Sequence, residues 1–132
     1  HEVIKKNSPL FRGFDDVFYA PHSRATEITA SQVEAVPELE IMAVSQEAGV
    51  AIVKSTDSRQ FFITCHPEYD SDTLKLEYER DVDKGLNPLP PVNYFPDDDP
   101  SKAPVVNWRS VGQLLISNWL NYYVYQSTPY KL

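Results

Sequence analysis

The chain has 132 residues, of which 42% are hydrophobic and 23% are charged. This composition is typical of one globular domain, or of a large piece of one, and it excludes a disordered tail. The formal net charge of −7 argues against non-specific binding to nucleic acid or to an anionic membrane, because both need a basic face. It is compatible with a local basic pocket for an anionic cofactor.

Residues 1–24 show turn signals and no regular period, with aromatic side chains that would anchor the segment to a core. Three strand-like runs follow at residues 39–44, 50–54 and 60–65. The third run is the richest in strand-forming residues, so we expect a hairpin of the first two strands that leads into a more central third strand.

Two helices are predicted after the strands. The first should be capped by Asp70 or Ser71, run to about Lys84 and stop at Gly85. Apolar side chains at i, i+4 and i+8 predict one buried stripe on this helix. The stripe consists of Leu74, Tyr78 and Val82.

The second helix should span about residues 108–126 and is apolar on most sides, so something large should cover it. Between the helices, residues 86–106 carry six prolines, which is typical of a functional lid or of a wrap along the surface. A few short strands and two such helices bury poorly among themselves. We therefore predict the incomplete half of an α/β sheet protein.

The longest uncharged run, residues 110–130, contains several amides, among them Gln113, Asn118 and Asn121. Amides are costly in hydrocarbon, so this run predicts a buried soluble helix rather than a membrane span. No basic-plus-apolar leader stands at the N-terminus, although the chain also begins without methionine. Cys65 is the single cysteine and cannot form an internal disulfide, so a cytoplasmic location is expected.

The segment His66-Pro67-Glu68 follows the third strand and is the most informative one for chemistry. Side chains alternate along an extended chain, so His66 and Glu68 can point to one side while Cys65 points to the other. A carboxylate beside an imidazole can hold its tautomer, as a general base requires, although the spacing alone is a weak signal. Cys65 is interpreted as a small buried hydrophobe, so a cysteine nucleophile would lie outside this chain.

Two further polar features can each be interpreted either as ordinary surface residues or as functional residues. Arg80, off the apolar stripe, is either a solvated arginine beside Glu77 or Asp81, or a clamp for a substrate carboxylate. The segment His22-Ser23-Arg24, taken alone, is a polar turn. No metal-ligand spacing is present, and no metal is expected.

Six longer motifs lie in a fixed order along the chain. They are Gly13-Phe14-Asp15-Asp16, Ala20-Pro21-His22-Ser23-Arg24, His66-Pro67-Glu68-Tyr69-Asp70, Asn93-Tyr94-Phe95-Pro96, Trp108-Arg109-Ser110 and Asn118-Trp119-Leu120-Asn121-Tyr122-Tyr123-Val124-Tyr125-Gln126. Over essentially all 132 residues the chain resembles the C-terminal part of homoserine O-succinyltransferase and its acetyltransferase relatives. Several long motifs at matching spacing are far more specific than one His-x-Glu pair.

The resemblance implies a class I glutamine-amidotransferase-like fold, a three-layer α/β sandwich, with residues 1–132 as the C-terminal part of one acyltransferase domain. It implies methionine biosynthesis, with an acetyl or succinyl group moved from acyl-CoA to the hydroxyl of L-homoserine through a cysteine thioester. No cofactor is implied beyond the acyl-CoA co-substrate. On this pattern His66 is the general base and Glu68 its orienting partner, while Ser23 contacts the substrate and Arg80 binds the carboxylate of the amino acid.

Expected partners are L-homoserine, acyl-CoA, the N-terminal half of the same protein and a second copy in a homodimer, but no nucleic acid and no membrane. The family's nucleophilic cysteine and oxyanion hole belong to that N-terminal half, so the 132-residue chain alone is expected to be inactive. Cys65 stands where the family usually has glycine, and Val111 where a histidine is common. The alternatives are a serine O-acyltransferase of the same family, a glutamine-amidotransferase-like hydrolase, and an interaction module without chemistry.

Overall fold

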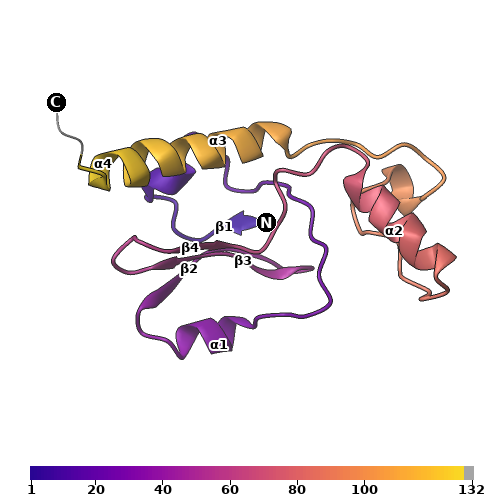
Figure 1. The fold of residues 1–132 in the computed structure, drawn as a ribbon, viewed down its shortest axis with the longest axis horizontal. Helices are drawn as coiled ribbons and strands as arrows, with labels where there is room; N and C mark the ends of the chain where they lie inside the picture. The colour runs from indigo at the N-terminus through magenta and orange to yellow at the C-terminus, as the bar shows by residue number, and fades with distance from the viewer. Residues whose placement is uncertain (130–132) are drawn as a thin grey trace.

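A four-stranded antiparallel sheet in the order β1-β2-β3-β4 lies at the centre of the structure, a computed structural model that describes residues 1–129. Its elements are β1 (Glu2–Val3), η1 (Pro9–Phe11), α1 (Ala30–Glu34), β2 (Leu39–Ser45), β3 (Gly49–Ser55), β4 (Phe61–Ile63), α2 (Thr73–Asp83), η2 (Pro96–Asp98), α3 (Arg109–Trp119), η3 (Leu120–Val124) and α4 (Tyr125–Ser127). Helix α3 lies along one face of the sheet and α1 along the opposite face (Figure 1). The predicted α/β class is confirmed. Among residues 1–129, no helix has the length and apolar character needed to cross a membrane.

The predicted hairpin is present as β2 and β3, which pair antiparallel from Leu39 opposite Ser55 to Ser45 opposite Gly49. Gly49 closes the turn at a φ of +68°, a conformation that other residues adopt only with strain. Strand β3 is buried along nearly its whole length, because the main core covers one face of the sheet and a smaller valine cluster under α1 covers the other. The hairpin is therefore the centre of the fold.

The third predicted strand is shorter and less central than expected. Within residues 1–129, β4 pairs with β3 alone and forms the edge of the sheet, and 46% of Phe62 is exposed. Strand propensity reports how well a residue fits a pleated, half-buried surface, so it identified a strand without fixing its place in the sheet. After β4 the chain is held by the hydroxyl of Thr64, which donates to the carbonyl of Val50 at 2.6 Å.

Helix α2 begins later than predicted and ends as predicted. Neither Asp70 nor Ser71 is its cap: the first helical residue is Thr73, and the N-cap Asp72 makes no side-chain capping bond. A separate turn precedes the helix, in which the amide of Thr73 donates to the carbonyl of Asp70 at 3.3 Å. Gly85 stops the helix with a φ of +70°, in agreement with the sequence.

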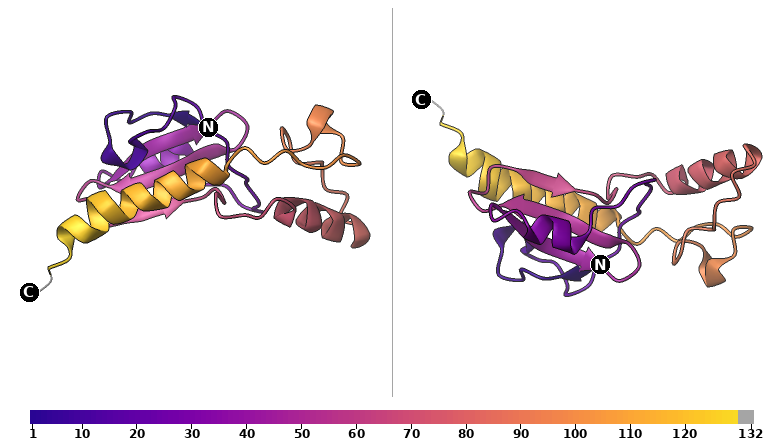
Figure 2. Two further views of the ribbon diagram at one scale, coloured as in Figure 1. Left: turned by 90° about the horizontal axis from the view of Figure 1, so that it is seen from above. Right: turned by 90° about the horizontal axis from the view of Figure 1, so that it is seen from below.

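The apolar stripe of α2 is only half buried. Leu74 is buried and Tyr78 partly so, but 47% of Val82 is exposed, because the C-terminal half of α2 projects away from the sheet (Figure 2). The proline-rich loop folds back on the other half, where Tyr94 and Phe95 form a small core with Leu74. This loop is thus a packed wrap with its own hydrophobic cluster.

The second predicted helix is confirmed as one nearly continuous helical stretch of α3, η3 and α4. Leu115 and Asn118 face the core. The side-chain amide of Asn118 donates from Nδ2 to the backbone carbonyls of Leu10 and Arg12, both at 2.9 Å. These bonds tie the η1 turn beneath the helix. Ile116 on the opposite side is exposed, so the sheet covers only one face of this apolar helix within residues 1–129.

Two short elements, β1 and α1, were not predicted. A capping box begins α1: the amide of Gln32 donates to the hydroxyl of Thr29 at 3.3 Å, and the amide of Thr29 donates to the side chain of Gln32 at 2.9 Å. This Thr-x-x-Gln signal was present in the sequence. Strand β1 has only two residues and is held by its long-range pairing with β2. The local sequence therefore contains no pattern that would predict it.

Candidate active site

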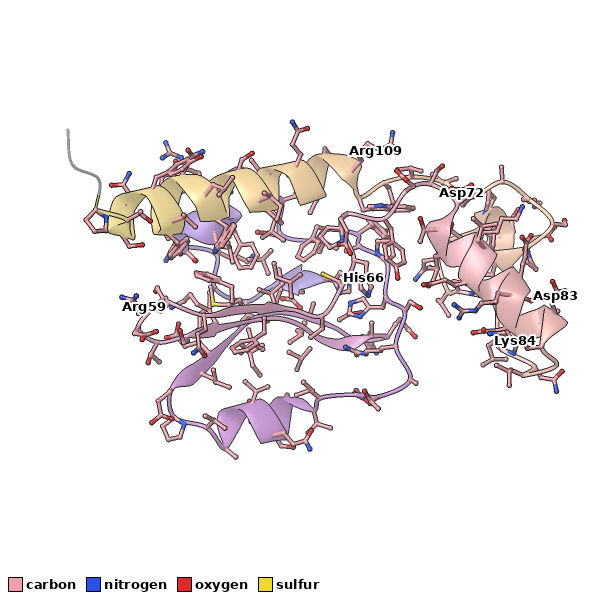
Figure 3. The ribbon with its side chains drawn as sticks, viewed as in Figure 1. Arg59, His66, Asp72, Asp83, Lys84 and Arg109 are labelled. Atoms are coloured by element: carbon pink, nitrogen blue, oxygen red, sulfur yellow. The ribbon has the colours of Figure 1, made fainter. Side chains whose placement is uncertain are left out.

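The structure consists of two regions, and the His-x-Glu segment lies where they meet (Figure 3). We call residues 1–69 and 108–127 the sheet body and residues 70–107 the α2 lobe. Nδ1 of His66 lies 2.8 Å from Oε1 of Glu68. A carboxylate only accepts hydrogen bonds, so Nδ1 carries the hydrogen and Nε2 keeps a lone pair that can take a proton. His66 is 34% exposed and Glu68 67% exposed.

The sheet body holds the backbone of this segment from two sides. The amide of His66 donates to the carbonyl of Pro21 at 2.7 Å. On the other side α3 approaches closely at Gly112, where an added Cβ would lie 2.5 Å from the carbonyl oxygen of Pro67. A groove of about 690 Å³ runs between the segment and α3. Any larger residue at position 112 would collide with Pro67, so glycine is required where α3 passes this segment.

Cys65 lies in the segment after β4 and is buried, as expected from the sequence. Loss of solvent raises the pKa of its thiol to about 12, and the nearby charge of Glu68 acts in the same direction. The thiol is therefore protonated at neutral pH and is a poor nucleophile, since the thiolate is the reactive form.

Ser23 and Arg80 come from distant parts of the chain and both lie near the side chain of Tyr69. Burial and the neighbouring Glu77 raise the pKa of the Tyr69 hydroxyl, and the nearby Ser23 partly offsets this. Arg80 donates from Nε to Asp81 at 2.8 Å, and this bond is the main reason why its pKa is raised, with smaller contributions from Glu77 and Tyr69. The guanidinium is thus exposed and paired locally, at the border of the same polar cluster.

Tyr69 and Glu77 complete this cluster and were not singled out as site residues from the sequence. The ring of Tyr69 stacks on that of His66, with centroids 4.4 Å apart and planes 17° apart. Its hydroxyl donates to Oε1 of Glu77 at 3.1 Å. The other oxygen, Oε2, is buried and has no hydrogen-bond partner among residues 1–129. The available signal was helical spacing, because Glu77 precedes Arg80 by three residues and so shares its face.

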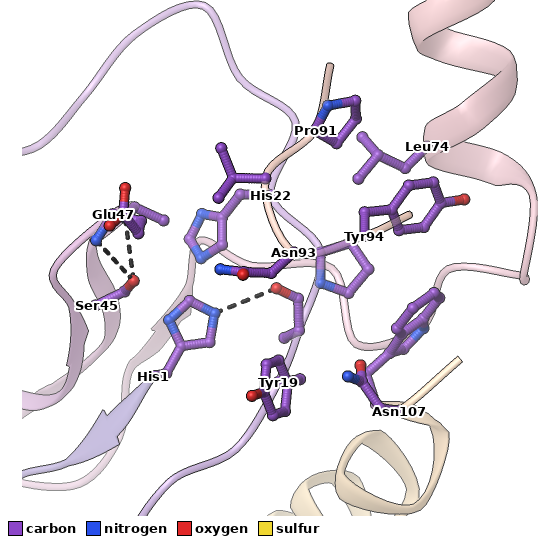
Figure 4. A pocket seen from close by; sticks show the side chains of 15 residues that line it. His1, Tyr19, His22, Ser45, Glu47, Leu74, Pro91, Asn93, Tyr94 and Asn107 are labelled. Carbon is purple, nitrogen blue, oxygen red and sulfur yellow. Dashed lines mark hydrogen bonds between the residues drawn. The ribbon is translucent and has the colours of Figure 1, made fainter. Parts of the chain in front are cut away.

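A second hollow, of about 260 Å³, lies between the His22 loop and the proline-rich loop (Figure 4). The ring of His22 lies 4.8 Å from that of His1, and both its nitrogens are buried without a hydrogen-bond partner in the part of the chain that the structure describes. Burial lowers the pKa of His22 to about 4, and the charges of Arg24 and His66 add to this. His22 is therefore neutral at pH 7 and adds no positive charge near His66.

In an α/β fold, an imidazole that follows a strand and is oriented by a carboxylate is suited to act as a general base. The chain matches the homoserine O-succinyltransferase family over residues 1–130 and belongs to that family. It is 60% identical to a homoserine O-acetyltransferase of Acetivibrio thermocellus, 57% identical to one of Methanomethylophilus alvi and 54% identical to a homoserine O-succinyltransferase of Pseudoalteromonas atlantica. Each comparison covers 132 residues, which is all of this chain and 43% of the relative. The chain thus spans less than half the length of these relatives.

Proposed function

We propose that the complete protein to which this chain belongs is a homoserine O-acyltransferase, which moves an acetyl or succinyl group from acyl-CoA to L-homoserine. The observation that carries this proposal is the 2.8 Å contact between His66 and Glu68, in a chain that matches the family over residues 1–130. Acylation of homoserine would serve methionine biosynthesis. No cofactor other than the acyl-CoA co-substrate enters the reaction.

The proposed reaction has two displacements that share one base. First, Nε2 of His66 takes the proton of a cysteine thiol in the N-terminal half, and the thiolate attacks the carbonyl carbon of acyl-CoA. The carbon–sulfur bond to CoA breaks, and CoA leaves with the proton. Next, Nε2 takes the proton of the homoserine hydroxyl, whose oxygen attacks the enzyme thioester and releases the cysteine with that proton. Glu68 stabilises the imidazolium in both steps, and Cys65 is unsuited to be the nucleophile because its pKa is about 12.

The polar cluster on α2 supplies groups of both signs for an amino-acid acceptor. Arg80 would bind the carboxylate of L-homoserine in exchange for Asp81, an exchange with a small cost because the present pair is exposed. The buried oxygen of Glu77 would accept from the ammonium group. Ser23 would contact the substrate beside Tyr69. Binding both charged groups on the α-carbon of the acceptor would direct the hydroxyl at its other end toward the base.

The same proposal extends to the fold and the partners of the chain. We infer a glutamine-amidotransferase-like three-layer sandwich in which the N-terminal half of the protein continues the sheet beyond β4. The support is that α3 and α1 lie on opposite faces of the sheet, while β4 is an edge with exposed apolar side chains within residues 1–129. A homodimer is part of the proposal, and light scattering of the complete protein tests it.

The decisive test is CoA release by the complete gene product, with acetyl-CoA and succinyl-CoA each tested against L-homoserine and L-serine. We expect release that depends on the acceptor and falls by at least about a thousandfold in His66→Ala, because the same base serves both displacements. The preferred pair identifies donor and acceptor together. The 132-residue chain alone is expected to release no CoA.

One further arm separates the hydrolase from the transferase. The same protein is incubated with L-glutamine, and ammonia is measured. Ammonia release that His66→Ala abolishes, together with no CoA release for any donor–acceptor pair, would replace the transferase by a glutamine-amidotransferase-like hydrolase.

A further inference from the structure

Tyr69 connects the His-x-Glu segment to the α2 lobe through contacts on every side of the residue. Its ring covers one face of the His66 imidazole, and its hydroxyl donates to Glu77. Its backbone is fixed as well: the amide donates to the carbonyl of His66 at 3.2 Å, and the carbonyl accepts from the indole of Trp108 at 2.9 Å. The side chain also packs against the small core of the lobe. Tyr69 is therefore a rigid link between these two parts.

The imidazole needs such a link because Glu68 alone restrains it poorly. Glu68 holds one ring nitrogen from a side chain that is two-thirds exposed, and a single hydrogen bond lets the ring plane tilt about it. A second ring stacked at 4.4 Å blocks that tilt. The stack and the hydrogen bond together fix the direction of the Nε2 lone pair.

We propose that Tyr69 is a positioning residue that couples the acceptor site on α2 to the orientation of His66. This proposal rests on the proposed acyl transfer. An acceptor bound at Glu77 and Arg80 immobilises the Glu77 carboxylate, which accepts the hydrogen bond from the Tyr69 hydroxyl. The Tyr69 ring is then held more firmly and in turn restrains the imidazole stacked on it. The ring contact therefore matters in both displacements, whereas the hydroxyl matters only in the second, when the acceptor is bound.

The two functions of Tyr69 are separated by two substitutions in the complete protein. Tyr69→Phe keeps the stacked ring and removes the hydroxyl, while Tyr69→Leu removes both. Tyr125→Phe is the matched control, because Tyr125 is 60% exposed on α4. Enzyme acylation is measured as the burst of CoA released without acceptor, and transfer as steady-state release with L-homoserine. The melting temperature of each variant is recorded as well.

We expect Tyr69→Phe to keep the burst rate within about twofold and to lower the rate of transfer about tenfold, as a small misalignment does. Tyr69→Leu should lower both rates by about tenfold or more. The proposal is overturned if both rates in Tyr69→Leu stay within about twofold of the parent. It is also overturned if Phe and Leu lower both rates equally and in parallel with the melting temperature, because that pattern describes a structural role.

A spectroscopic arm keeps the inference separate from the proposed reaction. If the parent protein itself releases no CoA with any pair, the acyltransferase proposal has failed, but the ¹⁵N shifts of the His66 ring still report its tautomer. We expect the parent and Tyr69→Phe to show one dominant tautomer with hydrogen on Nδ1, and Tyr69→Leu to show a mixture. The parent spectrum retained in Tyr69→Leu would overturn the positioning role.

Discussion

The sheet body and the α2 lobe differ in how well they bury their apolar side chains. The body encloses a continuous core contributed by strands β1 to β3, the η1 turn and α3. The lobe encloses one small cluster and exposes many apolar side chains. Those exposed in the lobe are Leu76, Val82, Leu86, Leu89, Val92 and Val105. A segment with few buried contacts opens locally at low free energy, so the lobe is the adjustable region of the two.

The proposed site takes a different contribution from each region. The base is fixed by the body, through the bond from His66 to Pro21 and the close approach of Gly112 to Pro67. The charged groups suited to an acceptor, Glu77 and Arg80, lie on the lobe. Chemistry thus depends on the rigid region, and acceptor recognition depends on the adjustable one. The substitutions below test this division, from the largest expected effect to the smallest.

At the junction, Glu68→Gln should lower kcat by about 10² to 10⁴-fold with little change in stability. Glutamine can turn its amide group toward Nδ1 of His66 and so favour the wrong tautomer. The measurement is steady-state CoA release by the complete protein with its preferred substrates. The matched control is Glu79→Gln, whose exposed pair with Lys75, 3.7 Å apart, contributes little. Equal kcat in the two variants would remove Glu68 from the proposed mechanism.

In the body, Asn118→Leu should destabilise the protein by about 2–4 kcal/mol, because the buried carbonyl of Leu10 and the partly buried carbonyl of Arg12 lose their donor. Denaturant unfolding of the complete protein measures the change. Asn121→Leu, at an exposed position on the same helical stretch, is the control and should change stability by less than about 0.5 kcal/mol. Similar losses in both variants would show that the bonds to η1 contribute little.

In the lobe, Glu77→Gln should raise the KM for L-homoserine about tenfold and leave the KM for acyl-CoA unchanged. The amide oxygen can still accept from Tyr69, so the substitution removes mainly the charge that would attract the ammonium. Glu79→Gln serves again as the control on the same helix. An unchanged KM for the acceptor would mean that its ammonium is recognised outside the α2 lobe.

The same division separates what the sequence could predict from what it could not. The contact of His66 with Glu68 was expected, but its geometric reason was wrong: these residues lie in a turn that the amide of Tyr69 closes onto the carbonyl of His66, not on an extended chain. The hairpin and both long helices have local signals. The cluster of Ser23, Tyr69 and Glu77 joins residues from three separate segments, so no local period indicated it. Ser23 was selected through family resemblance alone. The place of β4 at the edge was also missed, since position in a sheet depends on distant strands.

The His22 loop of the body should make stability depend on pH. The pKa of His22 is lowered from 6.5 to about 4, so the unfolded chain binds more protons than the folded one between these values. Stability should therefore fall by about 1–2 kcal/mol as pH drops from 6.5 to 4, after allowance for the partial exposure of the ring. In His22→Asn this contribution should vanish. Denaturant unfolding at pH 7 and 4.5 measures the difference, and identical pH dependence in both proteins would contradict it.

The smallest effect is expected at Cys65, which lies next to His66 in the chain but belongs to the body core. Its buried thiol is protonated at neutral pH, because its pKa is about 12. Cys65→Ala should therefore keep kcat within about twofold of the parent in the same CoA assay. A loss as large as that of Glu68→Gln would mean that a core side chain takes part in the chemistry. Packing and reaction could then no longer be assigned to different residues of this segment.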